Sequence, residues 1–210
     1  MNLIFMRHGE ATDNVKGLIS DKEIYWSVLT DEGIKNVVET VDLLPDNIDV
    51  MYVSPFPRTI QTAYYVFKKC PHVNVYIDNR IREIFYGKYS HQKNNSELDE
   101  IRKKQIAGDY FIRFGEYGDN KFDIEDRLTN FLLDVYNNND KDNTVLIVSH
   151  GSIISYMKRI LNVKSGHLKK GKIDVFNDVD FNNLFKHNEV LKNINIYKLN
   201  ENYSLIKMFQ

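Results

Sequence analysis

The chain has 210 residues and a formal net charge of −1, which suits a single domain (residues 1–210) large enough to bury a core. Apolar residues make up 42% and charged residues 27%, a globular balance, and the near-zero charge argues against nucleic acid or an acidic membrane as a partner. The one cysteine, Cys70, excludes an internal disulfide framework, so a reducing cytoplasm is the expected location. No apolar run nears the ~18 residues of a membrane span, and we expect neither a membrane segment nor a cleaved leader.

The chain opens with a strand that leads directly into a polar motif. The run Leu3-Ile4-Phe5-Met6 is short and apolar, which predicts a buried strand, and Arg7-His8-Gly9-Glu10 follows it. We expect residues 11–28 to form a loop that Asn14 ties down. Trp26 is interpreted as a core or lid-packing aromatic in preference to a substrate contact.

A helix and then a second strand–helix unit follow. Thr30 is a suitable N-cap for a helix that begins at Asp31. Residues 50–53 form the next predicted strand, and Arg58 lies in the first turn of the helix after it. A helix N-terminus offers free N–H groups and a positive dipole to an anion, and Arg58 adds a full charge. One face of the helix after Thr30 is apolar: Ile34, Val37, Val38 and Val41.

Glu83 is a candidate general acid. It follows a predicted strand at residues 73–77 and lies among apolar neighbours, a setting that raises the pKa of a carboxyl group. A structural ion pair with Arg80 or Arg82 is the alternative interpretation.

Residues 88–122 form a long excursion that we interpret as a lid over the site. They are rich in charges, asparagine and glycine, and one helix is expected at residues 96–107. His91 and Arg113 could face a substrate from this excursion, but exposed positions are favoured for both.

The C-terminal part contains one further strand–helix unit. The apolar run at residues 145–148 opens into Ser149-His150-Gly151, and a helix is expected at residues 152–161. Polar side chains in residues 163–190, His187 among them, are interpreted as solvated surface. Alternating runs within residues 193–208 predict a β-hairpin on the sheet edge. The preceding helix carries a buried stripe of Ile124, Leu128, Phe131, Leu132 and Val135.

The alternation of strands and helices predicts a three-layer α/β/α domain with a mostly parallel central sheet, an antiparallel edge and the lid insertion. Ligand sites in such sheets lie at the carboxyl ends of the strands. Three strand ends therefore bring together two arginines and two histidines: Arg7, His8, Arg58 and His150. Guanidinium forks and imidazoles in one pocket suit a doubly charged phosphoryl group.

Five motifs between residues 7 and 151 occur in the order of one known family. With them the chain resembles the histidine phosphatase superfamily (phosphoglycerate mutase-like, branch 1), and this resemblance implies the full strand order. Ala11 departs from the family pattern, which usually has Ser or Thr there, and Thr12 is the nearest substitute. The motifs are Arg7-His8-Gly9-Glu10 with Asn14, Leu29-Thr30-Asp31-Glu32-Gly33, Ser54-Pro55-Phe56-Pro57-Arg58, Arg82-Glu83-Ile84 with Gly87, and Val148-Ser149-His150-Gly151.

The expected activity is hydrolysis of a small phosphate ester through a phosphohistidine. His8 would attack phosphorus, His150 would help to neutralise the transferring group, and Glu83 matches the glutamate that protonates the leaving oxygen in the resembling enzymes. We expect no metal or other cofactor, because carboxylates do not cluster at metal-ligand spacing and two arginines disfavour a cation. The residues expected to hold the phosphoryl group are Arg7, Arg58, Asn14 and Gly151.

Two other functions stay open: a phosphoglycerate mutase, which is an isomerase with the same phosphohistidine, and a non-catalytic module that binds a phosphate ligand. In sequences resembling the mutases, an arginine follows the acid glutamate and a paired-arginine block lies in the excursion. Here Ile84 follows Glu83, and in place of the paired block there is only Arg113, near Phe114-Gly115-Glu116, although Tyr86-Gly87 does resemble the mutase pattern. The substrate and the oligomeric state stay open, with a homodimer among the alternatives.

Overall fold

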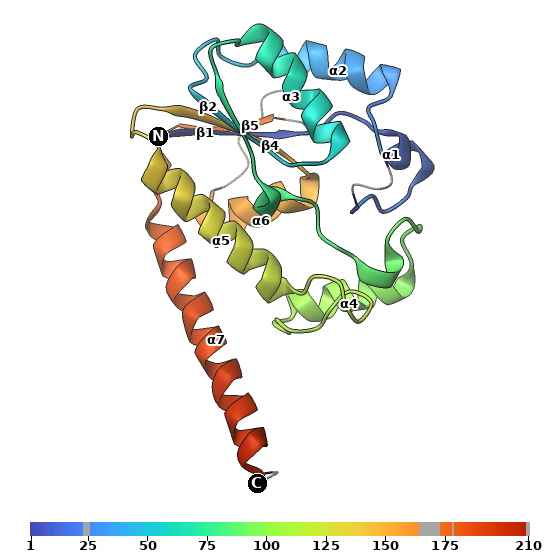
Figure 1. The fold of residues 1–210 in the computed structure, drawn as a ribbon, viewed down its shortest axis with the longest axis vertical. Helices are drawn as coiled ribbons and strands as arrows, with labels where there is room; N and C mark the ends of the chain where they lie inside the picture. The colour runs from blue at the N-terminus through green and yellow to red at the C-terminus, as the bar shows by residue number, and fades with distance from the viewer. Residues whose placement is uncertain (23–25, 164–172, 178, 209–210) are drawn as a thin grey trace.

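The computed structural model describes residues 1–22, 26–163, 173–177 and 179–208, and a five-stranded sheet lies at its centre (Figure 1). The strand order is β3-β2-β4-β1-β5. Four strands are parallel and β5 runs antiparallel to β1, so the predicted mostly parallel sheet with an antiparallel edge is confirmed. The strands are β1 (Asn2–Arg7), β2 (Val50–Val53), β3 (Asn74–Ile77), β4 (Thr144–Ser149) and β5 (Ile173–Phe176).

Helices cover both faces of the sheet, which confirms the three-layer α/β/α architecture. In Figure 1, α2 and α3 lie above the sheet and α5 and α6 lie below it, with α7 packed against these two. Short 3-10 turns occupy Asn79–Ile81 and Gly87–Tyr89. The helices are α1 (Thr12–Lys16), α2 (Asp31–Val41), α3 (Pro57–Lys69), α4 (Ser96–Ile106), α5 (Lys121–Asn138), α6 (Gly151–Leu161) and α7 (Asn182–Met208).

The strands divide their side chains between the two helical layers. Ile4 and Met6 of β1 pack with α2 and α3, whereas Leu3 and Phe5 pack with α5 and α6. This alternation follows from the two-residue period of a strand. All six residues of β4 are buried, as expected for a central parallel strand with helices on both faces. The carboxyl ends of β1, β2 and β4 therefore lie side by side and are held rigidly.

Helix α2 approaches the loop after β1 through a glycine. A Cβ on Gly33 would lie 2.1 Å from the carbonyl oxygen of Glu10, so only glycine permits this contact. Thr30 caps α2 as predicted, since its Oγ1 accepts a hydrogen bond from Gly33 N at 2.9 Å. The apolar face that we predicted for α2 includes one residue too many, because Val38 is 43% exposed and does not lie on the buried side of the helix. The motif at residues 29–33 thus supports the loop that carries His8.

The excursion contains α4, close to its predicted position, and is packed onto the domain rather than loosely attached. Leu98 and Phe114 are buried in the core beneath α4. The first part of the excursion is hydrogen-bonded to the loop after β1, because Ile19 N of that loop donates to Gln92 O at 2.9 Å. That loop is partly helical, because α1 lies within residues 11–28, where we had expected no helix.

The predicted C-terminal β-hairpin is wrong, since residues 182–208 form the helix α7. In Figure 1 the C-terminal half of α7 extends beyond the other helices. The hairpin interpretation relied on a short local alternation near residue 195. The buried side chains instead recur at helical spacing, because Leu184 and Leu191 lie seven residues apart and are 0% and 2% exposed. The antiparallel edge of the sheet comes from β5. No helix in the described part of the chain is long and apolar enough to cross a membrane.

Candidate active site

His8 lies where β1 ends and is held in one tautomer. Its Nδ1 is 2.6 Å from the carbonyl oxygen of Gly9, which can only accept, so Nδ1 carries the proton. The other ring nitrogen, Nε2, accepts a hydrogen bond from Arg58 Nε at 3.1 Å. The side chain is neutral in this arrangement, and the Nε2 lone pair points toward the arginine.

Arg58, in the first turn of α3, joins the two histidines. It is buried, and it donates from Nη2 to Nδ1 of His150 at 3.0 Å as well as to His8. The loop after β1 holds the guanidinium from the other side, since Nη1 donates to Ser20 Oγ at 3.0 Å and Nη2 to Ser20 O at 2.7 Å. Burial lowers the pKa of Arg58, with Glu83 the largest opposing charge. An anion entering the site would compete with these partners for the Arg58 donors.

His150 is the N-cap of α6 and is fully buried. Because the guanidinium of Arg58 can only donate, Nδ1 of His150 accepts and Nε2 donates to Ser54 Oγ at 2.7 Å. Burial, and then the charge of Arg58, hold the pKa of His150 well below its ordinary value. The rings of His8 and His150 lie edge to face with centroids 5.2 Å apart. The His150 side chain is therefore neutral, and its ring, fixed by two hydrogen bonds, forms one side of the site.

Glu83 faces the same centre. Its Oε2 is 4.0 Å from Nδ1 of His150, and its Oε1 accepts from Ile84 N at 2.9 Å. Burial raises the pKa of Glu83, and the hydrogen bond from Ile84 and nearby positive charges only partly offset that effect. The alternative ion pair is wrong. Arg80 pairs with Asp78 and Asp134, and Arg82 pairs with Asp119.

Arg7 is the exposed cation of the group. Its side chain lies over the start of α6, since a Cβ placed on Gly151 would be 3.3 Å from Arg7 Nε. Within the described residues it has no recorded hydrogen bond or ion pair. A guanidinium beside a helix N-terminus gives donors and positive potential to an incoming anion.

Comparison with known proteins agrees with this geometry. The sequence profile of the histidine phosphatase superfamily (branch 1) matches residues 3–178. The chain belongs to this superfamily. A 2,3-bisphosphoglycerate-dependent phosphoglycerate mutase of Thermoplasma acidophilum is 33% identical over 109 residues, a match that covers 50% of this chain and 52% of that protein, about half its length.

Solved structures show the same fold. An alpha-ribazole phosphatase from Shigella flexneri has a TM-score of 0.63 at 21% identity, covering 86% of this chain and 96% of the other. A mycobacterial glucosyl-3-phosphoglycerate phosphatase has a TM-score of 0.65 at 18% identity, covering 83% and 91%. At these identities the likeness establishes the fold.

Three polar side chains of this histidine phosphatase superfamily member were not recognised from its sequence. Ser20 and Ser54 orient Arg58 and His150, and serines in loops carry no pattern that reveals such partners. Arg127 of α5 donates to the carbonyl of Arg82 at 3.0 Å. Burial lowers the pKa of Arg127 to about 10, and its charge acts on Glu83 and His150. The sequence signal that could have revealed Arg127 is a charged residue beside the apolar stripe of α5.

The expectation for Asn14 is confirmed in part, and the expectation for Trp26 is not. Asn14 does tie down its loop, because its Oδ1 accepts from Ala11 N at 3.0 Å, and it lies at the exposed start of α1. Trp26 is 74% exposed, so the core or lid-packing interpretation is wrong. It lines an open apolar hollow together with Val28, Pro55, Pro57, Ile60 and Gln61.

The expected exposure of the remaining candidates is mostly confirmed. His91 and Arg113 are exposed, and Arg113 forms an ion pair with Asp123. His187 is not a solvated surface group, because its Nε2 lies 3.3 Å from Oε2 of the buried Glu125. Residues 164–172, which we interpreted as surface, lie outside the described residues.

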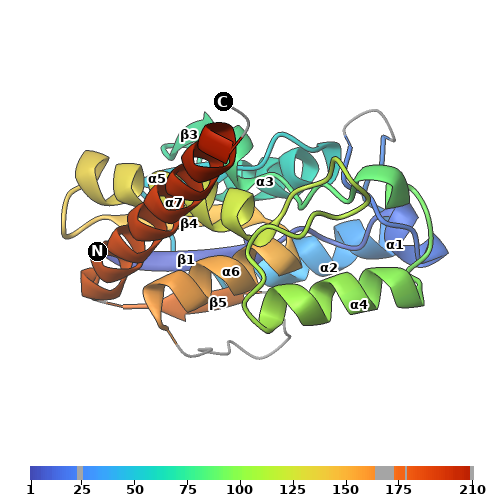
Figure 2. The ribbon, with the colours of Figure 1, turned by 90° about the horizontal axis from the view of Figure 1, so that it is seen from below.

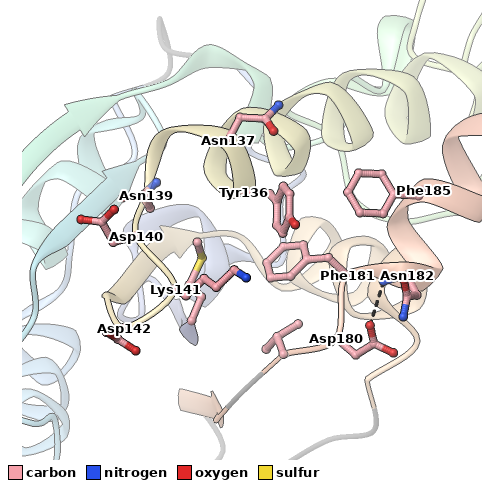
Figure 3. A pocket seen from close by; sticks show the side chains of 12 residues that line it. Tyr136, Asn137, Asn139, Asp140, Lys141, Asp142, Asp180, Phe181, Asn182 and Phe185 are labelled. Atoms are coloured by element: carbon pink, nitrogen blue, oxygen red, sulfur yellow. Dashed lines mark hydrogen bonds between the residues drawn. The ribbon is translucent and has the colours of Figure 1, made fainter.

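A hollow of about 640 Å³ lies at the opposite edge of the sheet. Met1 and Asp142, which line it, precede β1 and β4, so it adjoins the amino ends of these strands. Figure 3 shows Tyr136, Phe181 and Phe185 beside it, a side-chain set without the paired arginines and histidines at the carboxyl ends of the strands. Within the described residues, no three His, Cys, Asp or Glu side chains are grouped to hold a metal ion.

Proposed function

We propose that the protein is a metal-independent phosphomonoesterase that transfers the phosphoryl group of a small ester first to His8 and then to water. The state of His8 supports this most, because the hydrogen bond from Nδ1 to Gly9 puts the proton on Nδ1 and leaves a lone pair on Nε2. This lone pair, which accepts from Arg58 Nε, would attack phosphorus once a phosphoryl oxygen takes over that arginine donor. Arg7, Arg58 and the start of α6 would neutralise the dianion that otherwise repels a nucleophile. Asn14 Nδ2 and Gly151 N are the further donors we assign to the phosphoryl oxygens.

The two steps balance with Glu83 as the proton carrier. In the first, His8 Nε2 forms a bond to phosphorus, the ester P–O bond breaks, and the Glu83 proton passes to the leaving oxygen. In the second, water attacks phosphorus, the Glu83 carboxylate takes its proton, and the N–P bond breaks to release phosphate. The raised pKa of Glu83 supports the protonated starting form.

A phosphoglycerate mutase is the second candidate, and the 33% identical stretch of the Thermoplasma protein favours it. Against it, Ile84 is 4% exposed within the apolar core, so the position after the acid offers no charge to a substrate carboxylate. We expect inorganic phosphate to be released faster than 3- and 2-phosphoglycerate are interconverted. Both products should be followed in one reaction with catalytic 2,3-bisphosphoglycerate. Efficient isomerisation with little phosphate would favour the mutase.

The nucleophile can be tested directly. His8→Ala should abolish turnover of a panel of phosphate esters assayed in EDTA, while circular dichroism shows an intact fold. Quenching the wild-type reaction with labelled substrate in alkaline detergent should trap a phosphoprotein that is stable in base and loses its label in acid, and the variant should trap none. His72→Ala, on the surface between α3 and β3, is the matched control and should behave as wild type. A folded His8→Ala protein that keeps most of its activity would refute the mechanism, and a wild type without turnover would favour the non-catalytic module.

A further inference from the structure

Glu83 lies in a stretch of chain that is neither helix nor strand. The 3-10 turn at Asn79–Ile81 ends before it, and residues 82–86 form no regular element. A general acid must keep its proton within hydrogen-bond reach of the leaving oxygen, so contacts from outside this segment have to hold it in place. In Figure 2 the chain between β3 and α4 runs beside the segment that leads into α5, and Asp119 N of that segment donates to Phe85 O at 2.7 Å.

Arg127 of α5 binds two carbonyl groups on one side of the acid. Its Nη1 donates to Arg82 O at 3.0 Å and also to Arg80 O. Its Nη2 lies 3.5 Å from Oδ2 of Asp119. The Arg127 side chain is only 13% exposed, and among the described residues its buried Nε has no hydrogen-bond partner. The guanidinium therefore contacts backbone just before Glu83 from within the protein interior.

Asp119 holds the segment on the other side of the acid. Its Oδ2 accepts from Phe85 N at 3.0 Å. Its two carboxylate oxygens also accept from the Arg82 guanidinium, at 2.9 and 3.1 Å, and Arg82 Nη1 in turn donates to Glu83 O at 3.0 Å. Backbone groups before, at and after Glu83 are thus bonded to a connected set of three side chains: Arg82, Asp119 and Arg127.

Arg127 also brings a buried positive charge to the acid. Burial raises the pKa of Glu83, and the charges that oppose this effect are those of Arg58, Arg127 and Arg7. Arg58 and Arg7 are the groups we assign to the phosphoryl dianion, whose negative charge would cancel much of their effect on Glu83. The Nη atoms of Arg127 are bound to backbone and to Asp119, so its charge would still act on Glu83 when an ester is bound.

We propose that Arg127 is a positioning residue for proton transfer: with Asp119 it fixes the segment that carries Glu83, and its charge favours release of the Glu83 proton to the leaving oxygen. The inference rests on the proposed function for the role of Glu83. Burial keeps the proton on the acid before the reaction, and Arg127 stabilises the carboxylate that forms as the P–O bond breaks. Glu83 is therefore protonated at rest and still a strong enough acid to react.

Arg127→Met removes the charge and the guanidinium fork and places an apolar side chain in the buried position. We expect the ratio of kcat/KM for an alkyl phosphate to kcat/KM for p-nitrophenyl phosphate to fall by about tenfold or more, since only the poor leaving group needs the proton. The alkaline decline of kcat/KM for the alkyl ester should move to higher pH, because Glu83 holds its proton more tightly without this charge. Equal losses on both substrates would show a merely structural role and overturn the proposal.

Arg80→Gln is the matched control, because it removes a charge from the same segment. The Arg80 side chain pairs with Asp78 and Asp134, so this variant should keep the wild-type ratio and the wild-type pH of the decline. Arg127→Lys separates charge from geometry, since an ammonium keeps the charge without the fork. We expect its decline at the wild-type pH and its ratio between those of wild type and Arg127→Met. If Arg127→Met does not fold, a folded Arg127→Lys protein with the wild-type ratio overturns the proposal.

The charge of Arg127 can also be tested without turnover. Carbon NMR of protein labelled at the glutamate carboxyl carbons would follow the titration of Glu83, with Glu83→Gln to assign its signal. We expect the midpoint to lie at a higher pH in Arg127→Met than in wild type and to be unchanged in Arg80→Gln. An unchanged midpoint in Arg127→Met would overturn the proposal. A higher midpoint in a protein without phosphatase activity would refute only the proposed function, because the effect of Arg127 on Glu83 would stand.

Discussion

At the scale of single residues, Arg58 determines the protonation states of the site. It can only donate, and it donates to Nε2 of His8 and Nδ1 of His150 at the same time. Each histidine must therefore present a lone pair to it, and each must place its proton on the other nitrogen. The two rings become neutral with different tautomers, His8 bound to a backbone carbonyl and His150 to Ser54. One guanidinium thus fixes the tautomers of both imidazoles, and in the proposed mechanism this prepares His8 as the nucleophile.

Replacing Glu83 should show how much its proton contributes to hydrolysis in this buried, positively charged site. We expect Glu83→Gln to slow the hydrolysis of alkyl phosphates by ~10²–10⁴-fold and to slow p-nitrophenyl phosphate much less, since that leaving group needs little protonation. The alkaline decline of kcat/KM for alkyl esters, which reports loss of the Glu83 proton, should disappear. Glu116→Gln, exposed in the same excursion, is the control. Equal losses on both substrates would assign Glu83 to binding or structure.

The ionisation of the Glu83 carboxyl group should also make the stability of the fold decrease as pH rises. Burial raises the pKa of Glu83 in the folded protein, so its contribution to stability is complete below the ordinary carboxyl pKa and is lost as pH rises through the raised value. Glu83→Gln should therefore gain thermal stability relative to wild type as pH rises above the ordinary carboxyl pKa of about 4, until the raised pKa has been passed. Melting temperatures across this range would test it, and a difference that does not change with pH would contradict the raised pKa.

At the scale of elements, the site depends on how closely α2 approaches the loop after β1. The first turn of α2 contacts that loop through Gly33 and Thr30, and Thr30 Oγ1 also donates to the Glu10 carboxylate at 2.9 Å. This contact is distant from the reacting groups, but it supports the backbone that carries His8. The motif at residues 29–33 thus stabilises the loop and, through it, the position of His8.

Gly33→Ala should be destabilising, although alanine is the better helix former. The gain in helix propensity is about 1 kcal/mol, whereas the new Cβ would lie 2.1 Å from the backbone oxygen of Glu10, and relieving such a clash costs about 1–3 kcal/mol. Because the obstacle is backbone, the loop itself must move, and we expect activity to fall as well. Denaturant unfolding and kcat/KM would measure both effects. Lys35→Ala, exposed on the same helix, should change stability by less than about 0.5 kcal/mol.

At the scale of the whole molecule, α7 closes the layer formed by α5 and α6. Leu184 and Leu191 are buried on one side of α7, and Phe181 just before the helix packs against Tyr136 of α5 with tilted rings whose centroids are 4.9 Å apart. The last helix therefore contributes to the core, and none of its side chains that the structure describes (residues 182–195) is among the site residues. Its role is to cover the helices that hold Arg127 and His150.

Leu184→Ala should lower the free energy of unfolding by about 2–5 kcal/mol, because it removes a fully buried side chain from this interface. Val190→Ala is the matched control on the same helix, since Val190 is 48% exposed and its truncation should cost less than about 0.5 kcal/mol. Urea unfolding of the two variants gives the comparison. Equal effects would contradict the packing of α7.

The sequence by itself determined most strands and helices from β1 to α6, the superfamily and the residues that meet at the strand ends. It could do so because a buried parallel strand is a continuous apolar run, and parallel strands bring their carboxyl ends to one edge regardless of other details. His8, Arg58 and His150 each follow such a run, so their meeting was predictable. Glu83 was singled out from its apolar neighbours and the resemblance, and its Oε2 lies 4.0 Å from Nδ1 of His150; its role as the acid stays a prediction.

Only the tertiary structure decided which partners satisfy these groups and how the chain ends. Ser20 is 38 residues from Arg58, and no local period records a hydrogen bond between a loop and a distant helix. The short alternation near residue 195 favoured a strand, but burial of Leu184 and Leu191 against α5 and α6 stabilises a helix, since tertiary packing outweighs a weak local pattern.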